Sequence, residues 1–420
     1  MTRGSDESAG ATGSPPVNGS PRPASVPSPG TAREVFGAFL RLGLTSFGGP
    51  VAHLGYFRTE LVARRGWLGD GAYADLVALS QLLPGPASSK VGMAIGLHRA
   101  GMRGLLAAWA GFTLPSAIAL FAFAAGVASL GDLSDAGWVA GLKVAAVAVV
   151  AHAVLGMARN LTPDVPRAAI AVGAVALVLA APGPFAQVGA IAAAALLGLL
   201  VLRRVPLAPG AGEPLSARVS RPVALGAAAL LLALLVLLPV LARGGGGAVG
   251  LFDTFYRAGA LVFKDEHVVL PLLEAGVVQP GLVAPDTFLA GYGAAQAVSG
   301  PLFTVAAFLG AVTLSPPSGA VGAVIALVAI FLPGALLVIA AWPYWERLRT
   351  MPRVRRAIMG ANAGVVGILA AALWDPVIAH GIGSVTAGVM TVAGFVALLT
   401  GRMPPWALVA ASAGLGALLL

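Results

Sequence analysis

Long apolar stretches dominate this chain and decide what it can fold into. Each stretch approaches the ~20 residues that a helix needs to cross a ~30 Å hydrocarbon core. Only helices and closed barrels satisfy their backbone hydrogen bonds in lipid, and these stretches lack the alternation of barrel strands. The sequence therefore predicts an all-α polytopic membrane protein, with apolar stretches at Leu105–Leu130, Trp138–Ala158, Ala168–Ala181, Val188–Leu202, Val223–Ala242, Ala320–Ala341, Ile358–Leu373, Val377–Leu399 and Trp406–Leu420.

Composition excludes several functional classes. Only 10% of the residues are charged, against roughly 25% in soluble proteins. Cysteine is absent, so disulfides, thiolate metal sites and thiol nucleophiles are excluded. The net charge of +9 comes from basic residues between the apolar stretches, which is typical of cytoplasmic loops and not of nucleic-acid binding. No phosphate-binding Gly-rich loop with Lys-Ser/Thr is present, and we expect no cofactor and no bound metal.

The chain contains an internal repeat. Phe39-Leu-Arg41-Leu-Gly43-Leu-Thr-Ser-Phe47 aligns with Phe255-Tyr-Arg257-Ala-Gly259-Ala-Leu-Val-Phe263. Farther on, Gln81-Leu-Leu-Pro-Gly85-Pro86 aligns with Gln296-Ala-Val-Ser-Gly300-Pro301 at nearly the same spacing. Two matches in the same order indicate two related halves.

Loop charges give the relative orientation of the halves. Arg58–Arg65 is basic, whereas its counterpart Leu273–Pro280 carries only Glu274. Conversely, acidic Gly131–Ala136 corresponds to basic Glu346–Arg356. Because cytoplasmic loops are enriched in Lys and Arg, corresponding loops are expected on opposite sides of the membrane.

An inverted-repeat organisation follows, with the N-terminus in the cytoplasm. Each repeat is predicted to hold two re-entrant helical hairpins plus about four spanning helices, and one extra span links the repeats. The predicted divisions are a disordered tail at 1–32, a first repeat at 33–202, a basic linker with the extra span at 203–248, and an inverted second repeat at 249–420.

Short apolar segments that end in helix breakers predict the re-entrant hairpins. Val35–Phe47 stops at Gly48-Gly49-Pro50, and Asp75–Leu83 stops at Pro84-Gly85-Pro86. Irregular backbone inside a membrane is tolerated where protein or a watery cavity surrounds it. A helix that begins there directs unpaired N–H groups at the cavity and suits an oxyanion. Ser88, Ser89 and Lys90 would add two hydroxyls and a cation, unless Pro-Gly-Pro is only a kink between packed helices.

These residues resemble the chromate ion transporter family in its long, two-domain form. In the first half the likeness rests on Phe47-Gly-Gly-Pro50-Val-Ala-His53-Leu, Arg64-Arg-Gly-Trp67-Leu and Gln81-Leu-Leu-Pro-Gly-Pro86 with Ser88-Ser89-Lys90-Val-Gly92. In the second half it rests on Val268-Val-Leu-Pro271-Leu-Leu and on Gln296 with Gly300-Pro301.

The resemblance implies export of chromate from the cytoplasm, driven by the membrane gradient and giving chromate resistance. It implies a bacterial cell (inner) membrane location, with sulfate as the expected competitor and the lipid bilayer as surroundings. Two departures stand out. Where the family has a glycine-rich turn this chain has Lys264-Asp265-Glu266-His267, and before Gly300 it has Ser299 in place of the usual proline.

Several polar residues in apolar surroundings are candidates for the site, each with an alternative. Arg41 and Arg257 either face the anion or extend to the surface. Lys143 either interacts with the charge of the substrate or takes part in proton coupling, or it only contacts a packing partner. His53 and His267 could relay protons. The charged segment Lys264-Asp265-Glu266-His267 either takes part in proton coupling or anion gating, or lies nearer the outer surface. The substrate-binding candidates are Arg41, Phe47, Gly48, Gly49, Pro50, Gln81, Pro84, Gly85, Pro86, Ser88, Ser89, Lys90, Arg257, Gln296, Gly300 and Pro301; those for proton coupling or gating are His53, Lys143, Lys264, Asp265, Glu266 and His267.

A secondary transporter for chromate is the leading hypothesis, and other functions stay open. Sulfate or another oxyanion is the alternative substrate. A membrane-embedded lipid-phosphate hydrolase is the alternative class, but Ser88 and Ser89 have no Asp/Glu–His partner nearby in sequence. We therefore expect a non-enzyme, and the sequence leaves a homo-oligomer open.

Overall fold

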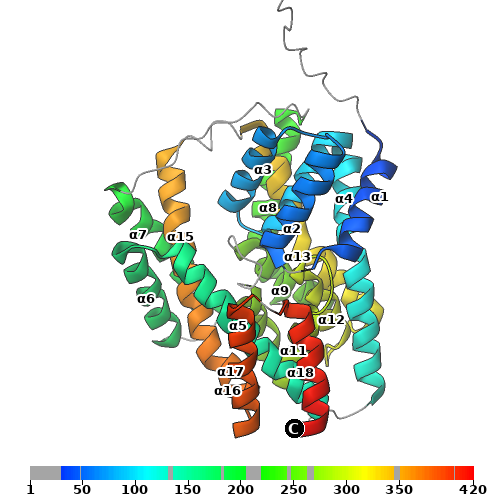
Figure 1. The fold of residues 1–420 in the computed structure, drawn as a ribbon. Helices are drawn as coiled ribbons and strands as arrows, with labels where there is room; N and C mark the ends of the chain where they lie inside the picture. Colours follow the sequence, from blue (N-terminus) through cyan, green and yellow to red (C-terminus); the bar gives the residue numbers. More distant parts are fainter. Residues whose placement is uncertain are drawn as a thin grey trace, which may run out of the picture.

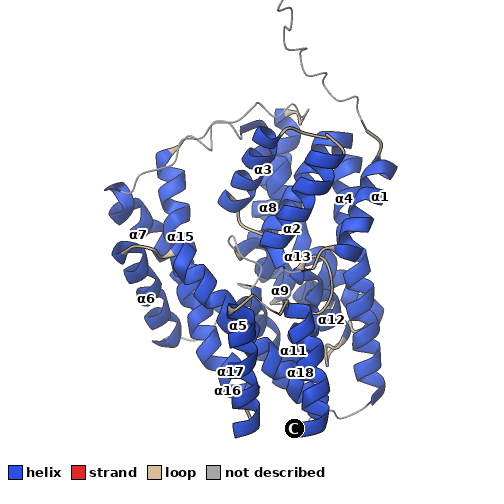
Figure 2. Ribbon diagram, viewed as in Figure 1, coloured by secondary structure: helices blue, strands red, loops and turns tan. Residues whose placement is uncertain are grey.

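The fold is built from helices and their connecting turns in the part of the chain that the structure describes. This computed structural model describes residues 30–47, 49–130, 136–180, 184–204, 219–243, 247–262, 269–344, 351–401 and 403–420. Within them no strand occurs (Figure 2). The prediction of an all-α protein is confirmed.

The helices divide into two series joined by α8, Arg221–Ala242. The first series is α1 Ala32–Thr45, α2 Gly49–Phe57, the π-helix η1 Arg58–Arg64, α3 Asp70–Leu82, α4 Ala87–Leu130, α5 Gly137–Leu161, α6 Val165–Ala180, α7 Pro184–Val201 and η2 Leu202–Arg204. The second is α9 Ala248–Leu261, α10 Val269–Leu273, the π-helix η4 Glu274–Val278, α11 Pro285–Ala295, η5 Leu302–Thr304, α12 Val305–Ala311, α13 Gly319–Ala341, η6 Trp342–Tyr344, α15 Pro352–Ala372, η7 Leu373–Ile378, α16 Ala379–Gly381, α17 Val385–Leu399 and α18 Pro405–Leu419.

Several helices suit a multi-pass membrane protein. Among the described residues, five are long and apolar enough to cross a membrane: those in α4, α5, α8, α13 with η6, and α15. Others are shorter than a full span: α6 has 16 residues and α17 and α18 have 15 each, so each rises only about 24 Å or less. The single span predicted at Val377–Leu399 is instead interrupted at 382–384.

The long helix α4 is two helices that reverse direction. Ala100 and Gly101 leave helical geometry, with φ/ψ of −140°/24° and 64°/−154°. A Cβ on Gly96 would collide with the Gly104 carbonyl oxygen, and a continuous helix does not bring these two positions together. The first arm therefore ends at this turn, and residues 102–130 form the long helix. The second series repeats the feature, because Gly310 of α12 meets Gly322 of α13 in the same way.

The helices pack as two bodies, and both bodies draw on both halves of the sequence. We name α1–α4 with α8–α13 the hairpin body, and α5–α7 with α15–α18 the flanking body. In the hairpin body α4 packs against α12 and α13; in the flanking body α5 packs against α17 and α18, and α15 against α6 and α7. Glycines allow the closest crossings: Gly141 lies on Gly416, and Gly360 lies on Gly198.

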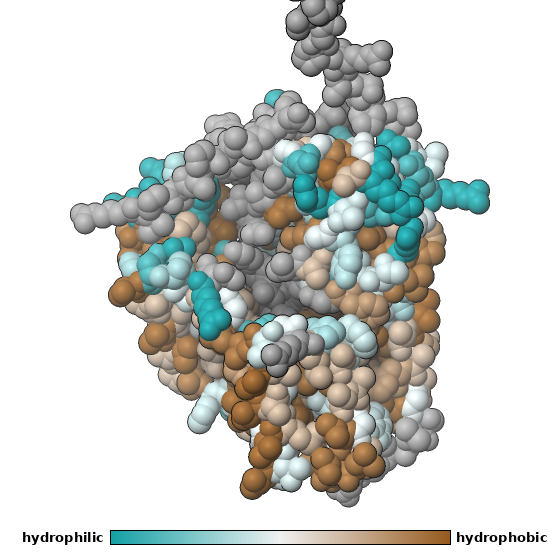
Figure 3. Space-filling view, in the orientation of Figure 1, coloured by the Kyte–Doolittle hydropathy of each residue, from teal (hydrophilic) through white to brown (hydrophobic). Residues whose placement is uncertain are grey.

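The two bodies are separated at one end of the molecule. Figure 3 shows the surface hollowed between α2 and α3 on one side and α5 and α15 on the other. The hollow opens toward the end where α1, α8 and α15 begin (Figure 1). We call this the basic end, because the described arginines of the adjoining helix ends and turns are Arg33, Arg58, Arg64, Arg65, Arg99, Arg103, Arg203, Arg221, Arg353, Arg355 and Arg356.

Candidate functional site

Four helix breaks are joined in pairs, each pair linking the first half to the second. The Gly300 amide donates to the Ser46 carbonyl at 3.0 Å, where α1 has just ended. The Gly85 amide donates to the Val262 carbonyl at 2.5 Å, where α9 has just ended. In the sequence alignment Ser46 matches Val262 and Gly85 matches Gly300. The same hydrogen bond is therefore made twice, with the roles of the halves exchanged.

Both breaks depend on glycine. Gly85 has φ +98° and Gly300 has φ +91°, a region that side chains disfavour. Gly300 also lies against α4, where a Cβ would be 3.0 Å from the Phe112 carbonyl oxygen and the Ser116 hydroxyl. A Cβ on Gly85 would be 3.5 Å from Gly334 of α13. Ser116 and Gly334 each follow a proline inside a helix, so the breaks lie against two proline-containing helices.

Helix starts after these breaks are buried in the protein. In the first turn of α4, Ser88 is fully buried and Ser89 is 3% exposed. The turn that starts η5 and α12 is buried as well, with Thr304 fully inside. The first N–H groups of a helix have no partner within the helix and carry a partial positive charge. The breaks thus bring helix N-termini, which would suit an anion, to buried positions in the protein.

Buried polar atoms without partners gather at and beside the breaks. Such atoms are rare unless a ligand or water satisfies them. Ser46 lies at the first break and Thr113 follows Phe112, which contacts Gly300; neither was predicted from the sequence. Their only signal is position, one directly before the Phe47 motif and one two residues before Pro115. Among the described residues, the unpartnered atoms here are Ser46 Oγ, His53 Nδ1, Ser89 Oγ, Thr113 Oγ1 and Gln296 Nε2.

Lys90 holds the α3–α4 hairpin closed. It is fully buried, and its Nζ donates to the Ser80 carbonyl at 2.6 Å and to the Leu83 carbonyl. These carbonyls belong to the end of α3, where a cation complements the helix dipole. The ammonium therefore points at the arm before the break, and its stem packs beside Gly85 and Gly334.

The two arginines that the repeat pairs lie in different environments. Arg257 Nη2 lies 2.6 Å from Asp253 Oδ2 on the same helix, and Asp253 is buried. Arg41 is exposed, and Gly37 stands where the repeat places Asp253. The arginine of the second half is therefore neutralised locally, whereas no ion pair joins Arg41 to another described residue.

Other predicted site residues are placed only in part. Phe47 is 6.0 Å from the Trp406 ring of α18, and the His53 ring packs edge-on against Phe112 at 5.2 Å. Pro86, Pro84 and Pro301 lie in the breaks, and Gly49 begins α2 with φ +77°. Gly48, Lys264, Asp265, Glu266 and His267 lie outside the described residues, as do the side chains of Pro50 and Gln81.

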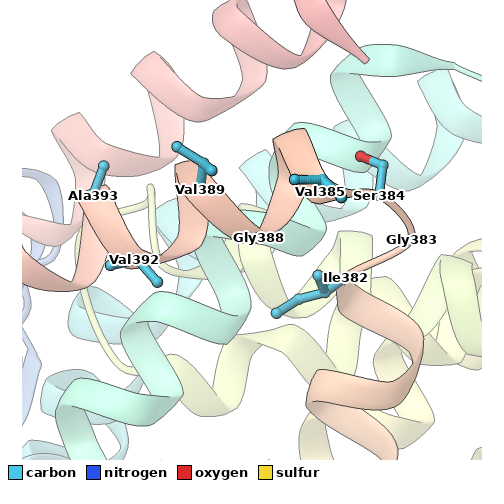
Figure 4. A pocket seen from close by; sticks show the side chains of 8 residues that line it. All are labelled: Ile382, Gly383, Ser384, Val385, Gly388, Val389, Val392 and Ala393. Carbon is cyan, nitrogen blue, oxygen red and sulfur yellow. The ribbon is translucent and has the colours of Figure 1, made fainter.

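Lys143 lies away from the breaks. It sits in the second turn of α5, and its Nζ is 3.1 Å from Asp286 Oδ1 at the start of α11. In the described residues no group of three His, Asp or Glu side chains is arranged to hold a metal. A groove of about 900 Å³ runs along α17 and is lined mainly by valines and small residues from Ile382 to Ala393 (Figure 4). Because the groove is apolar and open, it does not suit an anion.

Substitution of Ser89 tests the break as a binding site. We expect Ser89→Ala to lower anion transport about tenfold, equivalent to about 1.4 kcal/mol, and to leave the melting temperature unchanged because the hydroxyl has no described partner. Transport of the purified variant in liposomes and its thermal melting in detergent measure the two effects. Thr391→Val in α17, whose hydroxyl bonds within its own helix, is the control. Wild-type transport by Ser89→Ala would remove this hydroxyl from the site.

Comparisons with known proteins agree on one family. A family model described as "Chromate transporter" matches residues 33–199 and again residues 249–417. The chain is 29% identical over 388 residues to a chromate transport protein of Pseudomonas aeruginosa, covering 89% of this chain and 88% of that one. It is 27% identical to a chromate transport protein of Cupriavidus metallidurans and 26% identical to a probable chromate transport protein of Synechococcus elongatus, covering at least 80% of each chain. No solved structure matches the chain.

Proposed function

Because the chain belongs to the chromate transporter family, we propose that it exports chromate from the cytoplasm through a site at the paired helix breaks. The gradient across the membrane drives the export. The membrane is the bacterial inner membrane, the N-terminus lies in the cytoplasm, and the basic end faces the cytoplasm because cytoplasmic loops are rich in Arg and Lys.

The pairing of the breaks is the observation that carries this proposal. Gly300 with Ser46 and Gly85 with Val262 bring a break of each half against a break of the other. Helix starts at these breaks provide N–H donors without bringing a full positive charge into the membrane. Chromate is a tetrahedral dianion, and donors arriving from several directions suit its four oxygens.

Inverted repeats with re-entrant hairpins explain why the breaks are paired. Support comes from features that recur at matching places: a π-helix after each first hairpin, η1 and η4, and a proline inside each long helix, Pro115 and Pro333. The family model also matches each half separately. We therefore retain the division into a tail at 1–32, a first repeat at 33–202, a linker with the extra span at 203–248 and a second repeat at 249–420.

Recognition by helix N–H groups does not by itself separate chromate from sulfate. Both are tetrahedral dianions of similar shape, so sulfate should compete, and sulfate transport is the second candidate function. The lipid-phosphate hydrolase remains the alternative of another class. Ser88 and Ser89 lie inside the protein at the start of α4, which leaves no open face for a lipid headgroup.

Chromate accumulation in a sensitive bacterium tests the proposal. Cells that express the chain are expected to accumulate less chromate than cells with an empty vector and to grow at higher chromate concentrations. A protonophore should abolish the difference if the gradient supplies the energy, and excess sulfate should reduce it. Equal accumulation with and without the chain, at verified expression, would refute chromate export.

A further inference from the structure

The most extensive contact between the two bodies lies away from the basic end, where α5 of the flanking body packs against α11 of the hairpin body. In addition, α10 packs against α15, and the Phe47 ring lies near Trp406 of α18. A Cβ on Gly293 of α11 would be 2.6 Å from the Leu142 carbonyl oxygen of α5, so the two backbones touch. Val139, Leu142 and Ala145 of α5 bury an apolar patch with Ala290 of α11. Beside this patch Lys143 and Asp286 form their ion pair.

This ion pair is placed to hold the contact closed. The Lys143 side chain is 14% exposed and that of Asp286 is 45% exposed, so the pair borders the apolar patch and reaches its rim. Asp286 lies in the first turn of α11, where a carboxylate is favoured by the helix dipole. The other charged or titratable residues of α5, α11 and α16 are His152 and Arg159, both more than two helical turns farther along α5, Tyr292 near the end of α11, and His380 of α16, whose side chain lies outside the described part of the structure.

The matching contact at the basic end is open. Gly141 of α5 crosses Gly416 of α18, and Gly360 of α15 crosses Gly198 of α7. When these two crossings are aligned, Gly141 matches Gly360. Lys143 of α5 therefore corresponds to Asn362 of α15. By the breaks at Gly85 and Gly300, α11 corresponds to α3. Among the described residues, α3 and α15 share no contact comparable to that of α5 and α11, and the surface in Figure 3 is hollowed between them. Asn362 is 8% exposed, and its Oδ1 has no partner among the described residues.

We propose that Lys143 and Asp286 latch the α5–α11 contact as a gate on the side opposite the basic end, and that transport replaces this gate by an α3–α15 contact in which Asn362 finds its partner. The inference rests on the proposed function for its direction. Chromate enters through the hollow while the latch is closed, and it leaves when the bodies rock so that α5 separates from α11. Inverted repeats make the two gates alternatives, because each half then takes the arrangement of the other.

Cysteine cross-linking tests the gate directly, since the native chain has no cysteine. In Leu142→Cys/Gly293→Cys the Cβ atoms would be 3.4 Å apart, close to the ~3.5–4.5 Å of disulfides. Ala78→Cys/Ala361→Cys is the matching pair at the basic end. Both double-cysteine variants are purified, reconstituted into liposomes and oxidised with and without chromate. We expect the first pair to form a disulfide that stops transport until it is reduced, and the second to form one only as the bodies rock.

Variants of the latch test its residues. Lys143→Met should speed disulfide formation by the Ala78→Cys/Ala361→Cys pair about fivefold, the effect of an ion pair of about 1 kcal/mol. The charge swap Lys143→Asp/Asp286→Lys should restore the original rate. Asp164→Asn removes a comparable ion pair with Arg167 inside the flanking body and should change nothing.

Two outcomes would overturn the inference. In the first, the Ala78→Cys/Ala361→Cys pair never forms a disulfide although the Leu142→Cys/Gly293→Cys pair does. In the second, Lys143→Met leaves the rate of disulfide formation by the Ala78→Cys/Ala361→Cys pair unchanged. Disulfide formation is scored without measuring transport. If both disulfides form but the chain transports no chromate, only the proposed function is refuted. If the chain transports chromate but the second disulfide does not form, only the gate is refuted.

Discussion

A Gly300→Val chain is expected to fold and reach the membrane but to lose chromate export almost completely. Valine at φ +91° is strained by about 1–3 kcal/mol. Its side chain would also collide with the Phe112 carbonyl and Ser116 hydroxyl of α4. The break must then move away from α4 and give up the hydrogen bond to Ser46. A shift of about 1 Å in a positioned group reduces activity on the order of a hundredfold, and we expect a loss of that size in the initial rate of chromate transport.

A matched control separates strain from position. Gly281 has φ +76°, but no atom lies within 4 Å of the point that its Cβ would occupy, and it lies in an exposed turn away from the breaks. Gly281→Val should therefore cost similar strain and keep normal transport. Gly85→Val should behave like Gly300→Val, since Gly85 makes the equivalent bond to Val262. Transport by Gly300→Val at the level of Gly281→Val would contradict the role of the breaks.

Lys90→Met is expected to cause the largest loss of stability. Methionine occupies about the same space as the lysine stem but leaves the carbonyls of Ser80 and Leu83 without the donor that Lys90 provides. Each buried group left unsatisfied costs about 1–3 kcal/mol. Since proteins are stable by only about 5–15 kcal/mol, the variant should melt at a clearly lower temperature and accumulate poorly. Thermal melting of the detergent-purified protein, followed by size-exclusion chromatography, measures this.

Lys143→Met serves as the control for losing a lysine. Its ion pair with Asp286 is partly exposed, so its removal should cost about 1 kcal/mol or less. If Lys90→Met melts at the wild-type temperature, the bonds from Lys90 to the end of α3 do not stabilise the hairpin.

Sequence patterns predict where the helices stop. Local signals are enough at these places, because Gly and Pro end helices through their own backbone geometry. Thus α1 ends at Thr45 and α3 at Leu82, beside the predicted breakers, and the two halves recur at matching positions. Apolar stretches likewise predict the long helices. The interruption of Val377–Leu399 was missed because Gly381 and Gly383 lie in a stretch whose hydropathy stays high.

Contacts between distant segments were not predictable in the same way. The direction of the Lys90 ammonium depends on where α3 ends relative to α4, and nothing in Ser88-Ser89-Lys90 alone shows it. Asp286 is 143 residues from Lys143 along the chain, so no local pattern relates them. The partition into two bodies also has no local signal, because each body takes helices from both halves.

The inequality of the two halves persists in the structure. Arg257 forms an ion pair with Asp253, whereas the residue of the first half that aligns with Asp253 is Gly37, which cannot pair with Arg41. Ser299, where the family usually has proline, uses its hydroxyl to bond the Gly43 carbonyl at 2.6 Å. This departure therefore adds a hydrogen bond between the two halves.

Uptake into everted bacterial membrane vesicles tests the central proposal most directly. In such vesicles the cytoplasmic face points outward, so an exporter concentrates chromate inside. With the gradient imposed, vesicles that contain the chain should accumulate chromate, those with Gly300→Val should not, and a protonophore should release what has accumulated. Accumulation by the chain no greater than by empty-vector vesicles, with the protein present in the membrane, would contradict export through the paired breaks.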